Sequence, residues 1–550
     1  MREGDHHCDF LVLGGGAAGL TGALAARLAG LDVLLAEKEA WLGGATALSG
    51  GTVWLPASHV LERAGVADSC EDGLRYLEAL VGPGRDEVDR ERMKIFVRES
   101  PAFARFLDDQ GLALRHARGW SDYYAELPGG REAGRTLYCD ALDLRALGEA
   151  EEWLAPGALF SAAHSVEVST MALGIRSLAA ARAALRVAAR SAKARLTGAR
   201  PATRGKALIG RLLLAARRSG VAVWRSTPLV ELIVEEGRVA GAVLDRDGKR
   251  VRVIARRGVL LATGGFARHA GLRQIHQAPV GVDATMAPAG DMGDGIRAAA
   301  NAGAEMAMMD QAWWVPGTKT PAGPMVHVWD RCFPHSLVVD VAGERYMDEA
   351  GPYMEVGQRM IARHAALGAD HSWLILESRH RSRYAFGMAP PMVTPPGWIE
   401  SGYLIRAGSV DELAERTGLP LQRLRDTLDR FNAGARAGRD DDHGRGSKAI
   451  SRYYGDRRVR PNPNLGPVER PPFYAVRLYP GDVGTAGGVR TDLHGRALDP
   501  ALKPIAGLYA AGNNASGIFG PCYPGAGASI APGMLFGRRA ALHAAQGGAE

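Results

Sequence analysis

Three glycines near the start of the chain have the spacing of a dinucleotide-binding turn. Gly14, Gly16 and Gly19 follow the apolar run 10–13 and open a segment of small residues. In such a turn the first glycine permits a sharp bend, the second lets phosphates approach the backbone, and the third lets helix and strand pack closely. We therefore expect a pyrophosphate to bind at the start of a helix, where free N–H groups favour an anion.

An acidic residue stands where the ribose of a dinucleotide is expected. Glu37 ends a second apolar run, residues 32–36, and follows the glycines by about 20 residues, the usual spacing of an acid that binds a ribose hydroxyl. A glycine triplet alone is weak evidence, because the chain contains 71 glycines. The two strand patterns and the terminal acid together favour a dinucleotide site over an ordinary turn.

The length and cysteine content of the chain limit its class. A chain of 550 residues is too long to fold around a single hydrophobic core, so two or three domains are expected. Its five cysteines are widely spaced and include no CxxC pair, which argues against a disulfide framework or a metal site. The sequence has no signal-peptide pattern and no apolar run of about 18 residues. We therefore expect a cytoplasmic protein without a spanning helix.

The positive charge of the chain is concentrated in one segment. Residues 168–230 contain thirteen Lys and Arg and no Asp or Glu, although the net charge of the whole chain is only +7. The residues with helical spacing within it are Arg182, Arg186, Arg190 and Lys193. This pattern favours an interfacial helix that lies on the anionic inner face of a membrane, or else a solvated basic face. Nucleic-acid binding is not expected, because aromatic residues are not interleaved with the basic ones.

The remaining patterns place secondary structure and domains. Helices are expected over 84–117 and 207–218, strands over 221–224 and 258–266, and a hairpin over 229–244 that turns at Glu236 and Gly237. Residues 285–470 differ in composition from the rest of the chain, because they are richer in Met, Trp and Pro. The predicted fold is α/β: a Rossmann-type domain of residues 1–284 and 471–550, with an inserted α+β cap domain of residues 285–470. The basic segment 165–206 is expected to be an insertion in the first part.

Several separated motifs resemble the fumarate reductase/succinate dehydrogenase flavoprotein superfamily. The glycine turn with Glu37, the strand end 262–265 and the turn 511–513 are similar to its FAD-binding elements. Within it the chain resembles the 3-ketosteroid Δ1-dehydrogenases, including membrane-associated members that act on cholest-4-en-3-one. The segments that carry this likeness are 343–346, 352–353, 452–456, 461–465, 472–475, 480–488 and 523–527. The resemblance covers nearly the whole chain except about residues 165–205.

The resemblance implies which residues bind FAD. They are Gly14, Gly16, Ala17, Ala18, Gly19, Glu37, Lys38, Gly43, Gly44, Thr46, Ser49, Gly50, Gly51, Val230, Ala262, Thr263, Gly264, Gly512, Asn513, Ser529 and Ile530. Some relatives attach FAD to a histidine, but residues 43–52 contain none. We therefore expect the cofactor to be bound non-covalently.

The resemblance also implies a reaction and its catalytic residues. A 3-oxo-4-ene steroid would lose a proton from C2 to Tyr353 and a hydride from C1 to flavin N5, giving a 1,4-dien-3-one. Tyr123 would support the base, and the Tyr523 hydroxyl with the Gly527 N–H would polarise the ketone. Tyr346 is an alternative candidate for the base, and Tyr124 is an alternative candidate for the residue that supports it. A tyrosine has a pKa near 10, so activity that rises with pH is expected. An external, quinone-like acceptor would reoxidise the flavin.

The sequence motifs leave three other functions open. A 3-oxo-5α-steroid 4-dehydrogenase would use related chemistry, but the run 523–527 favours the 1-dehydrogenase. An ene reductase related to fumarate reductase is disfavoured, since Thr485 and Ala486 stand where a histidine is expected. Ala350 to Tyr353 likewise lack the arginine that donates the proton. A flavin-binding scaffold on a membrane surface, without turnover, is the non-enzymatic alternative.

Overall fold

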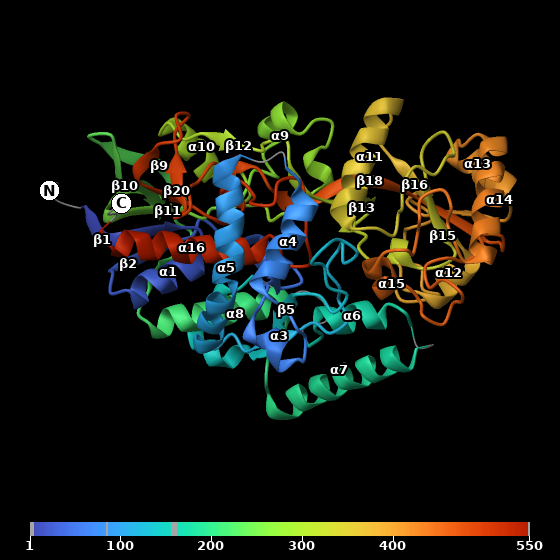
Figure 1. Cartoon of the computed structure of the whole chain (residues 1–550), viewed down its shortest axis with the longest axis horizontal. Coiled ribbons are helices and arrows are strands. Elements are labelled where there is room, and N and C mark those ends of the chain that lie inside the picture. The colour runs from blue at the N-terminus through green and yellow to red at the C-terminus, as the bar shows by residue number, and fades with distance from the viewer. Residues whose placement is uncertain (1–4, 84–85, 156–161, 175–176, 548–550) are drawn as a thin grey trace.

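A parallel sheet brings the first and last strands of the chain together (Figure 1). The computed structural model describes residues 5–83, 86–155, 162–174 and 177–547. In it β1 (His6–Leu13) lies between β2 (Val33–Ala36) and β11 (Lys249–Leu261), and β11 also pairs in parallel with β21 (Pro504–Ala510). On the other side β2 pairs with β8 (Ala222–Trp224). The C-terminal segment therefore completes the sheet that the N-terminus begins, which confirms the α/β, Rossmann-type prediction.

Two helices of small residues pack against each other beside this sheet. α1 (Ala17–Leu28) follows the glycine turn and runs along α16 (Ile530–Ala545), and ten of the twelve α1 residues are buried. Their packing depends on glycine. A Cβ atom at Gly19 would lie 1.9 Å from the Gly14 carbonyl oxygen, and one at Gly537 would lie 2.5 Å from the Ala18 carbonyl oxygen.

The predicted hairpin is confirmed, and one predicted helix is shorter than expected. β9 (Leu229–Glu235) and β10 (Arg238–Arg246) are antiparallel, and Glu236 and Gly237 both have positive φ in the turn between them. Within the predicted range 84–117, α5 spans only Glu87–Asp109. Gly111, at a φ of +84°, then turns the chain into β4 (Leu114–His116). β4 and β3 (Thr52–Trp54) both pair with β5 (Thr136–Cys139).

A second, six-stranded sheet forms the core of the other half of the molecule. Its strands are β13 (Ala312–Thr320), β14 (Gly323–Val326), β15 (Ser336–Val339), β16 (Ser372–Glu377), β17 (Ile405–Ala407) and β18 (Phe473–Thr485). α11 (Tyr353–Leu367) packs on β13 and β18, while α13 (Val410–Thr417) and α14 (Leu421–Ala437) lie at the outer end (Figure 1). Its strand pairs are all antiparallel and its helices are separate from the strands, which makes this the α+β unit that was expected.

β18 lies on the other side of a predicted boundary. The division at residue 470 assigned residues 473–485 to the nucleotide-binding part, but β18 pairs with β13, β16 and β17 of the second sheet. α10 (Asp294–Asn301) was assigned to the cap, yet it packs against β9 and β19 (Gly488–Val489). The strand pairing therefore places both domain boundaries further along the chain than the change in composition did.

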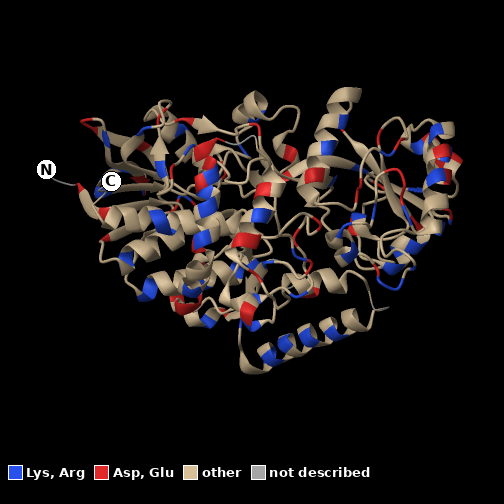
Figure 2. Ribbon diagram, in the orientation of Figure 1, with Lys and Arg blue, Asp and Glu red and all other residues tan. Residues whose placement is uncertain are grey.

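The basic segment forms three helices, one of which stands apart from the body. α6 (Ser165–Met171), α7 (Leu178–Thr197) and α8 (Arg204–Arg218) follow one another, and only α8 is mostly buried. Figure 2 shows Lys and Arg positions, in blue, along α7, which lies outside the rest of the ribbon, and no Asp or Glu position in red. Among the described residues, no helix is both long and apolar enough to cross a membrane.

The remaining elements are short or connect the larger ones. They are α2 (Gly44–Leu48), α3 (His59–Arg63), α4 (Cys70–Val81), β6 (Leu142–Asp143), η1 (Leu144–Trp153), β7 (Pro201–Ala202), α9 (Ala270–His276), η2 (Val282–Ala284), β12 (Met306–Ala307), η3 (Asp330–Cys332), α12 (Ser378–Arg383), α15 (Ala449–Tyr454), β20 (Arg496–Leu498) and η4 (Gly512–Asn514).

Replacement of Gly19 by alanine tests the close packing of the first turn. The new methyl would overlap the Gly14 carbonyl, which belongs to the backbone and cannot turn away, so we expect a loss of stability of at least about 1–3 kcal/mol. The measurement is thermal unfolding of cofactor-free protein. Gly16→Ala is the matched control, because no heavy atom lies within 4 Å of the position of its Cβ. Equal melting temperatures for the two variants would contradict this account.

Candidate active site

The glycine turn leaves space where a pyrophosphate can lie. Gly14 has a φ of +111°, and a Cβ there would lie 2.2 Å from the carbonyl oxygen of Ala262, so the turn passes directly over the end of β11. Gly16 precedes α1, and the space beside it is open. An open position before a helix N-terminus fits a phosphate group, which N–H groups can bind there.

Glu37 is held rigidly beside this turn. One carboxylate oxygen accepts a 2.6 Å hydrogen bond from the Gly15 N–H, and the other accepts one of 2.9 Å from the Glu39 N–H. Burial raises the pKa of this carboxyl group, while the two N–H donors lower it. Each oxygen retains a second acceptor site, as ribose binding requires. Lys38 does not face the same way, since its ammonium group pairs with Asp294 at 2.6 Å.

Residues 43–51, which include four glycines, are shaped by their contact with α8. A Cβ at Gly51 would lie 2.2 Å from the backbone carbon of Arg204. The Ser49 hydroxyl donates to the Thr46 carbonyl oxygen at 2.7 Å and accepts from the Gly51 N–H at 3.0 Å. Gly44 has a positive φ and open space at its Cβ position. These contacts fix a backbone surface on which a flat ring system can lie.

The strand ends predicted to bind cofactor also meet in space. The Thr263 hydroxyl donates to the Asn514 side-chain oxygen at 2.5 Å, next to Gly512, whose Cβ position is 3.1 Å from the Ala18 methyl group. Asn513 accepts a 3.0 Å hydrogen bond from the Trp313 indole, which links this turn to β13. Val230 differs from the rest because it lies on β9 and is 39% exposed. We call the surface formed by residues 14–19, 37, 43–51, 262–264 and 512–513 the cofactor cradle. It suits FAD at most of the predicted positions.

Three tyrosines form a compact cluster between the two sheets. The ring centroid of Tyr353 lies 5.5 Å from that of Tyr123 and 5.4 Å from that of Tyr523, and the other two are 5.8 Å apart. Tyr353 opens α11, Tyr123 follows β4, and Tyr523 precedes α16. Residues separated by up to 400 positions in the sequence are thus brought together.

Hydrogen bonds from neighbouring elements fix the positions of the three tyrosines. The carbonyl oxygen of Pro524 accepts from the Tyr123 N–H at 2.9 Å and from the Tyr76 hydroxyl at 2.7 Å. The Gln358 amide on α11 donates to the Pro521 carbonyl oxygen at 2.8 Å. The segments that carry Tyr123 and Tyr353 are therefore both tied to the segment 521–524, which contains Tyr523.

Tyr123 is further fixed by the residue before it. Asp122 is fully buried, pairs with the buried Arg135 at 2.5 Å and accepts a 2.8 Å hydrogen bond from the Trp54 indole. Arg135 also pairs with Asp68 at 2.7 Å. Removing one partner of such a buried ion pair is strongly destabilising, so this network is a rigid support.

The electrostatic surroundings of the tyrosines oppose ionisation. Burial raises the pKa of Tyr353 and of Tyr123 well above the usual value of 10, and their neighbouring hydroxyls add to this effect at Tyr353. The Tyr523 hydroxyl lies 3.2 Å from that of Ser529. Gly527, at a φ of +97°, passes so close to Thr52 that a Cβ would lie 2.5 Å from the Thr52 carbonyl group. Only glycine fits there.

The two alternative tyrosines point elsewhere. The hydroxyl of Tyr346 hydrogen-bonds with Ser372 at 2.8 Å, within the core of the second sheet. Tyr124 interacts with Glu355, and the Lys448 ammonium lies 5.5 Å from its ring centroid. Neither reaches the ring cluster, so Tyr353 and Tyr123 are the better candidates.

Sequence reasoning missed several residues next to the cluster. Trp313 lies 5.4 Å from Tyr523 between ring centroids, and Tyr454 has a buried hydroxyl with no hydrogen-bond partner among the described residues. Arg331 is 1% exposed and lowers the pKa of both Tyr123 and Tyr454. The segment 452–456 pointed toward Tyr454 only as part of a family motif, and no pattern distinguished Arg331.

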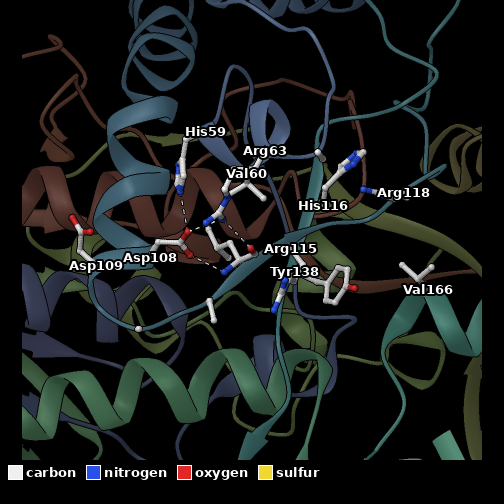
Figure 3. Close-up of a pocket in the computed structure, with 14 residues that line it drawn as sticks. His59, Val60, Arg63, Asp108, Asp109, Arg115, His116, Arg118, Tyr138 and Val166 are labelled. Carbon is white, nitrogen blue, oxygen red and sulfur yellow. Dashed lines mark hydrogen bonds and ion pairs between the residues drawn. The ribbon is translucent and has the colours of Figure 1, made fainter. Parts of the chain in front are cut away.

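A surface groove lies away from these residues (Figure 3). It has a volume of about 890 Å³ and is lined by α3, the end of α5, β4, Tyr138 and Val166. Asp108 on its wall pairs with His59 at 2.9 Å and with Arg63 at 3.0 Å. None of its lining residues belongs to the tyrosine cluster or the cofactor cradle. Among the described residues, no group of three or more His, Cys, Asp and Glu could hold a metal ion.

Comparison with known proteins gives consistent matches. The family described as "FAD binding domain" matches residues 9–530. The chain is 39% identical to the 3-oxosteroid 1-dehydrogenase of Mycobacterium tuberculosis over 98% of each chain. It is 33% identical to the 4-oxocyclohex-2-ene-1-carboxylate 5-dehydrogenase of Sinomonas cyclohexanicum, over 97% of this chain and 93% of that one.

A solved structure agrees with these sequence matches. The 3-ketosteroid Δ1-dehydrogenase of Sterolibacterium denitrificans in complex with 1,4-androstadiene-3,17-dione superposes with a TM-score of 0.92 at 32% identity. The match covers 98% of this chain and all of that one.

The Gly16→Ala variant tests the phosphate position. A methyl group would occupy the space left for the pyrophosphate without touching the protein, so the variant should fold normally but bind FAD at least about tenfold more weakly. Flavin fluorescence on titration of cofactor-free protein measures this affinity. Unchanged affinity would place the pyrophosphate elsewhere.

Proposed function

The chain belongs to the FAD-binding flavoprotein family that contains the 3-oxosteroid 1-dehydrogenases, and we propose that it catalyses the 1,2-dehydrogenation of 3-oxo-4-ene steroids to 1,4-dien-3-ones. The observation that carries this proposal is the cluster of Tyr123, Tyr353 and Tyr523 beside Gly527. It supplies both a base and hydroxyl donors next to the cofactor cradle. The enzyme is therefore a flavin-dependent oxidoreductase acting on a CH–CH bond.

The proposed mechanism assigns each reacting atom to a residue. Bound FAD supplies an acceptor for the hydride, and this part of the chemistry belongs to the cofactor. The ionised oxygen of Tyr353 removes the C2 proton, forming an O–H bond. The electrons of the broken C2–H bond become the C1=C2 double bond as the hydride leaves C1.

The ketone oxygen needs hydrogen-bond donors while C2 loses its proton. The carbanion at C2 is stabilised as an enolate on the C3 oxygen, so donors there lower the barrier. The Tyr523 hydroxyl and the Gly527 N–H are proposed for this task. The Gly527 N–H makes no hydrogen bond to another described residue, while its carbonyl oxygen accepts from Ile530 and Ala531. Loss of one such donor typically lowers the rate by about 10²–10³.

The acceptor that reoxidises the flavin is external to the chain. Each turnover removes two electrons and two protons from the steroid, and a quinone takes up the same number on becoming a hydroquinone, so we propose a quinone-like acceptor. An artificial quinone or dye serves the same purpose in an assay.

Replacement of Tyr353 by phenylalanine should abolish turnover. The variant removes one oxygen atom while retaining the ring packing, so flavin binding and steroid binding should remain close to those of the native enzyme. Anaerobic mixing with androst-4-ene-3,17-dione and measurement of flavin bleaching give the rate. Tyr346→Phe is the matched control and should keep its activity. Bleaching at a near-normal rate in Tyr353→Phe would remove this residue as the base.

The rate of flavin reduction should increase with pH. Because burial raises the Tyr353 pKa above 10, the ionised fraction at neutral pH is small and grows about tenfold for each pH unit until the pKa is reached. Stopped-flow reduction between pH 6 and pH 10 measures this slope. A rate that falls as pH rises would show that the rate-limiting proton transfer needs the protonated phenol.

The product distinguishes the proposed reaction from its nearest alternatives. Androst-4-ene-3,17-dione should give the 1,4-diene by mass spectrometry and NMR. A 4-dehydrogenase would instead oxidise 5α-androstane-3,17-dione to the 4-ene, and a fumarate reductase-like enzyme would reduce an activated alkene. A flavin-binding scaffold would give no bleaching with any steroid.

We also propose that α7 binds the surface of an anionic membrane. Leu178, Leu185 and Leu196 are 74%, 70% and 89% exposed, and their spacing of seven and eleven residues places them on one side of the helix. Ala180 and Ala183 are buried on the side that faces the body. An exposed leucine row with basic neighbours and no acidic residue is typical of an interfacial helix.

The basic residues of α7 divide into two groups. Arg190 pairs with Glu167 of α6 at 2.9 Å and so anchors the helix to the body. Arg182 and Lys193 are exposed, and their helical spacing places them beside the leucine row, where they can reach lipid headgroups. Such attraction adds about 1 kcal/mol for each basic residue near the surface and weakens as salt screens it.

Charge reversal on α7 tests the membrane proposal. The native protein should pellet with phosphatidylglycerol-containing vesicles at low salt and be released at high salt. Arg182→Glu with Lys193→Glu should abolish pelleting. Arg416→Glu with Arg425→Glu, on α13 and α14, changes the net charge equally and should have no effect. Absence of pelleting by the native protein at low salt would refute the proposal.

A further inference from the structure

The end of α6, which leads into α7, touches the cap domain. The Ala385 N–H donates to the Ala172 carbonyl oxygen at 2.9 Å. A Cβ atom at Gly174 would lie 2.7 Å from the Arg383 carbonyl oxygen and 3.3 Å from the Pro391 ring. Figure 1 shows α12 and α15 on the side of the second sheet on which α6 and α7 lie. The basic insertion and the loop after α12 are therefore in direct contact.

The loop after α12 presents two apolar side chains to the solvent. Met392 is 78% exposed and Val393 is 49% exposed. Met392 has a φ of +65°, a left-handed conformation that is unfavourable for methionine. Arg381 holds the turn in place, because its carbonyl oxygen accepts from the Met392 N–H at 2.8 Å and its guanidinium donates to the Val393 carbonyl oxygen at 2.7 Å. Single exposed apolar residues are common, but a strained, clamped turn that exposes two of them indicates a contact made in function.

The composition of this loop suits a lipid interface. Residues 390–396 include four prolines, which have no N–H group, so fewer backbone donors lose water when the loop leaves the solvent. Residues 378–399 contain no Asp or Glu. No acidic side chain of this segment therefore opposes its approach to an anionic surface.

Three arginines lie on a neighbouring loop. Arg457, Arg458 and Arg460 are exposed, and none of them forms an ion pair with another residue that the structure describes. Their loop begins at Asp456, whose carboxylate accepts from the Tyr384 hydroxyl at 2.8 Å and from the Arg458 N–H at 3.0 Å. Because Tyr384 directly follows α12, which also clamps the apolar turn, both loops are fixed to the same short helix.

The leucine row of α7 begins close to these loops. Leu178 stands four residues after Gly174, so their Cα atoms are at most about 14 Å apart. Gly174 in turn lies against Pro391, the neighbour of Met392. The apolar and basic groups of the cap domain therefore continue the surface that α7 presents.

We propose that Met392, Val393, Arg457, Arg458 and Arg460 form a second contact with anionic lipid, an assignment that rests on the proposed function of α7. We call these five residues the cap contact surface. Apolar side chains beside unpaired cations suit the boundary between headgroups and acyl chains. Two contacts on one body also strengthen each other, since binding at one keeps the other near the lipid. Because α7 and the cap contact surface belong to different domains, both halves of the enzyme meet the membrane at once.

Replacement of the two apolar residues tests the turn. Met392→Asn with Val393→Thr should keep the fold, because asparagine tolerates a left-handed φ and threonine has the shape of valine. Leu502→Asn is the matched control, since Leu502 is 43% exposed at a φ of +60° but lies between β20 and β21 of the first sheet. The double variant should bind phosphatidylglycerol-containing vesicles about tenfold more weakly than the native protein, and the control should bind normally. Equal affinities of the two variants would overturn the proposal.

Neutralisation of the arginines tests the charge. Arg457→Gln with Arg458→Gln should weaken vesicle binding about thirtyfold at low salt, and this difference should shrink as salt rises. Arg416→Gln with Arg425→Gln removes the same charge from α13 and α14 and should have no effect. An equal loss in both pairs would show that only the net charge matters, which contradicts a defined surface.

Hydrogen exchange measured on the native, FAD-loaded protein locates the contact. Peptides covering residues 386–400, 455–462 and 178–197 should exchange more slowly with phosphatidylglycerol-containing vesicles, but not with vesicles of phosphatidylcholine alone. Protection confined to residues 178–197 would overturn the cap contact while leaving that of α7. Protection in none of the three would remove both. Protection of residues 386–400 at high protein concentration without vesicles would assign the turn to contact between copies of the chain instead.

Two substrates connect the contact to catalysis. Dehydrogenation of dissolved androst-4-ene-3,17-dione without vesicles should be unchanged in every variant, because none of the replaced residues belongs to the tyrosine cluster or the cofactor cradle. Dehydrogenation of cholest-4-en-3-one held in anionic vesicles should fall with vesicle affinity. An unchanged rate with the vesicle-held steroid in Met392→Asn with Val393→Thr would count against the contact. Vesicle binding is measured without substrate, so failure of the dehydrogenase assignment would leave that result untouched.

Discussion

A phenol can serve as a base only where its anion is stabilised, and the interior of this protein opposes that anion. Tyr123 and Tyr523 are almost fully buried, and burial raises the pKa of both Tyr123 and Tyr353. The site must therefore supply positive potential without filling the space that the steroid needs.

The same need for close approach explains why the site lies between two sheets. Tyr353 belongs to the helix on the second sheet, Tyr123 to the loop after β4, and Tyr523 to the segment that returns to the first sheet. The Pro524 carbonyl oxygen accepts from the Tyr123 N–H and from the Tyr76 hydroxyl, and the Pro521 carbonyl oxygen accepts from the Gln358 side chain of α11. Gly527 can approach Thr52 only because it lacks a side chain. Cofactor cradle and tyrosine cluster are therefore parts of one packed unit.

The sequence predicted the parts of this structure that depend on local patterns. Apolar runs and glycine spacing located β1, the turn and α1, and the hairpin of β9 and β10 was expected at its observed turn. The tyrosines were found only by resemblance, because nothing in the spacing of three residues so far apart indicates that they meet. The roles assigned to them and to the cofactor-binding residues stay predictions.

What could not be predicted depends on long-range contacts. Asp122, Arg135 and Trp54 form one buried network, yet each looks ordinary in its own segment. β18 follows a change in composition but pairs with the sheet that precedes this change.

The basic insertion is joined to the tyrosine cluster by a short series of contacts. α7 is anchored to α6 through Arg190 and Glu167, and Val166 of α6 packs against the same hydrophobic core as Tyr353. Tyr453 also packs against this core and contacts Tyr454, which is part of it. A helix held at a lipid surface would thus place this side of the cluster toward the phase in which apolar sterols dissolve. Because such substrates partition into lipid rather than water, this orientation would shorten the route from the membrane to the base.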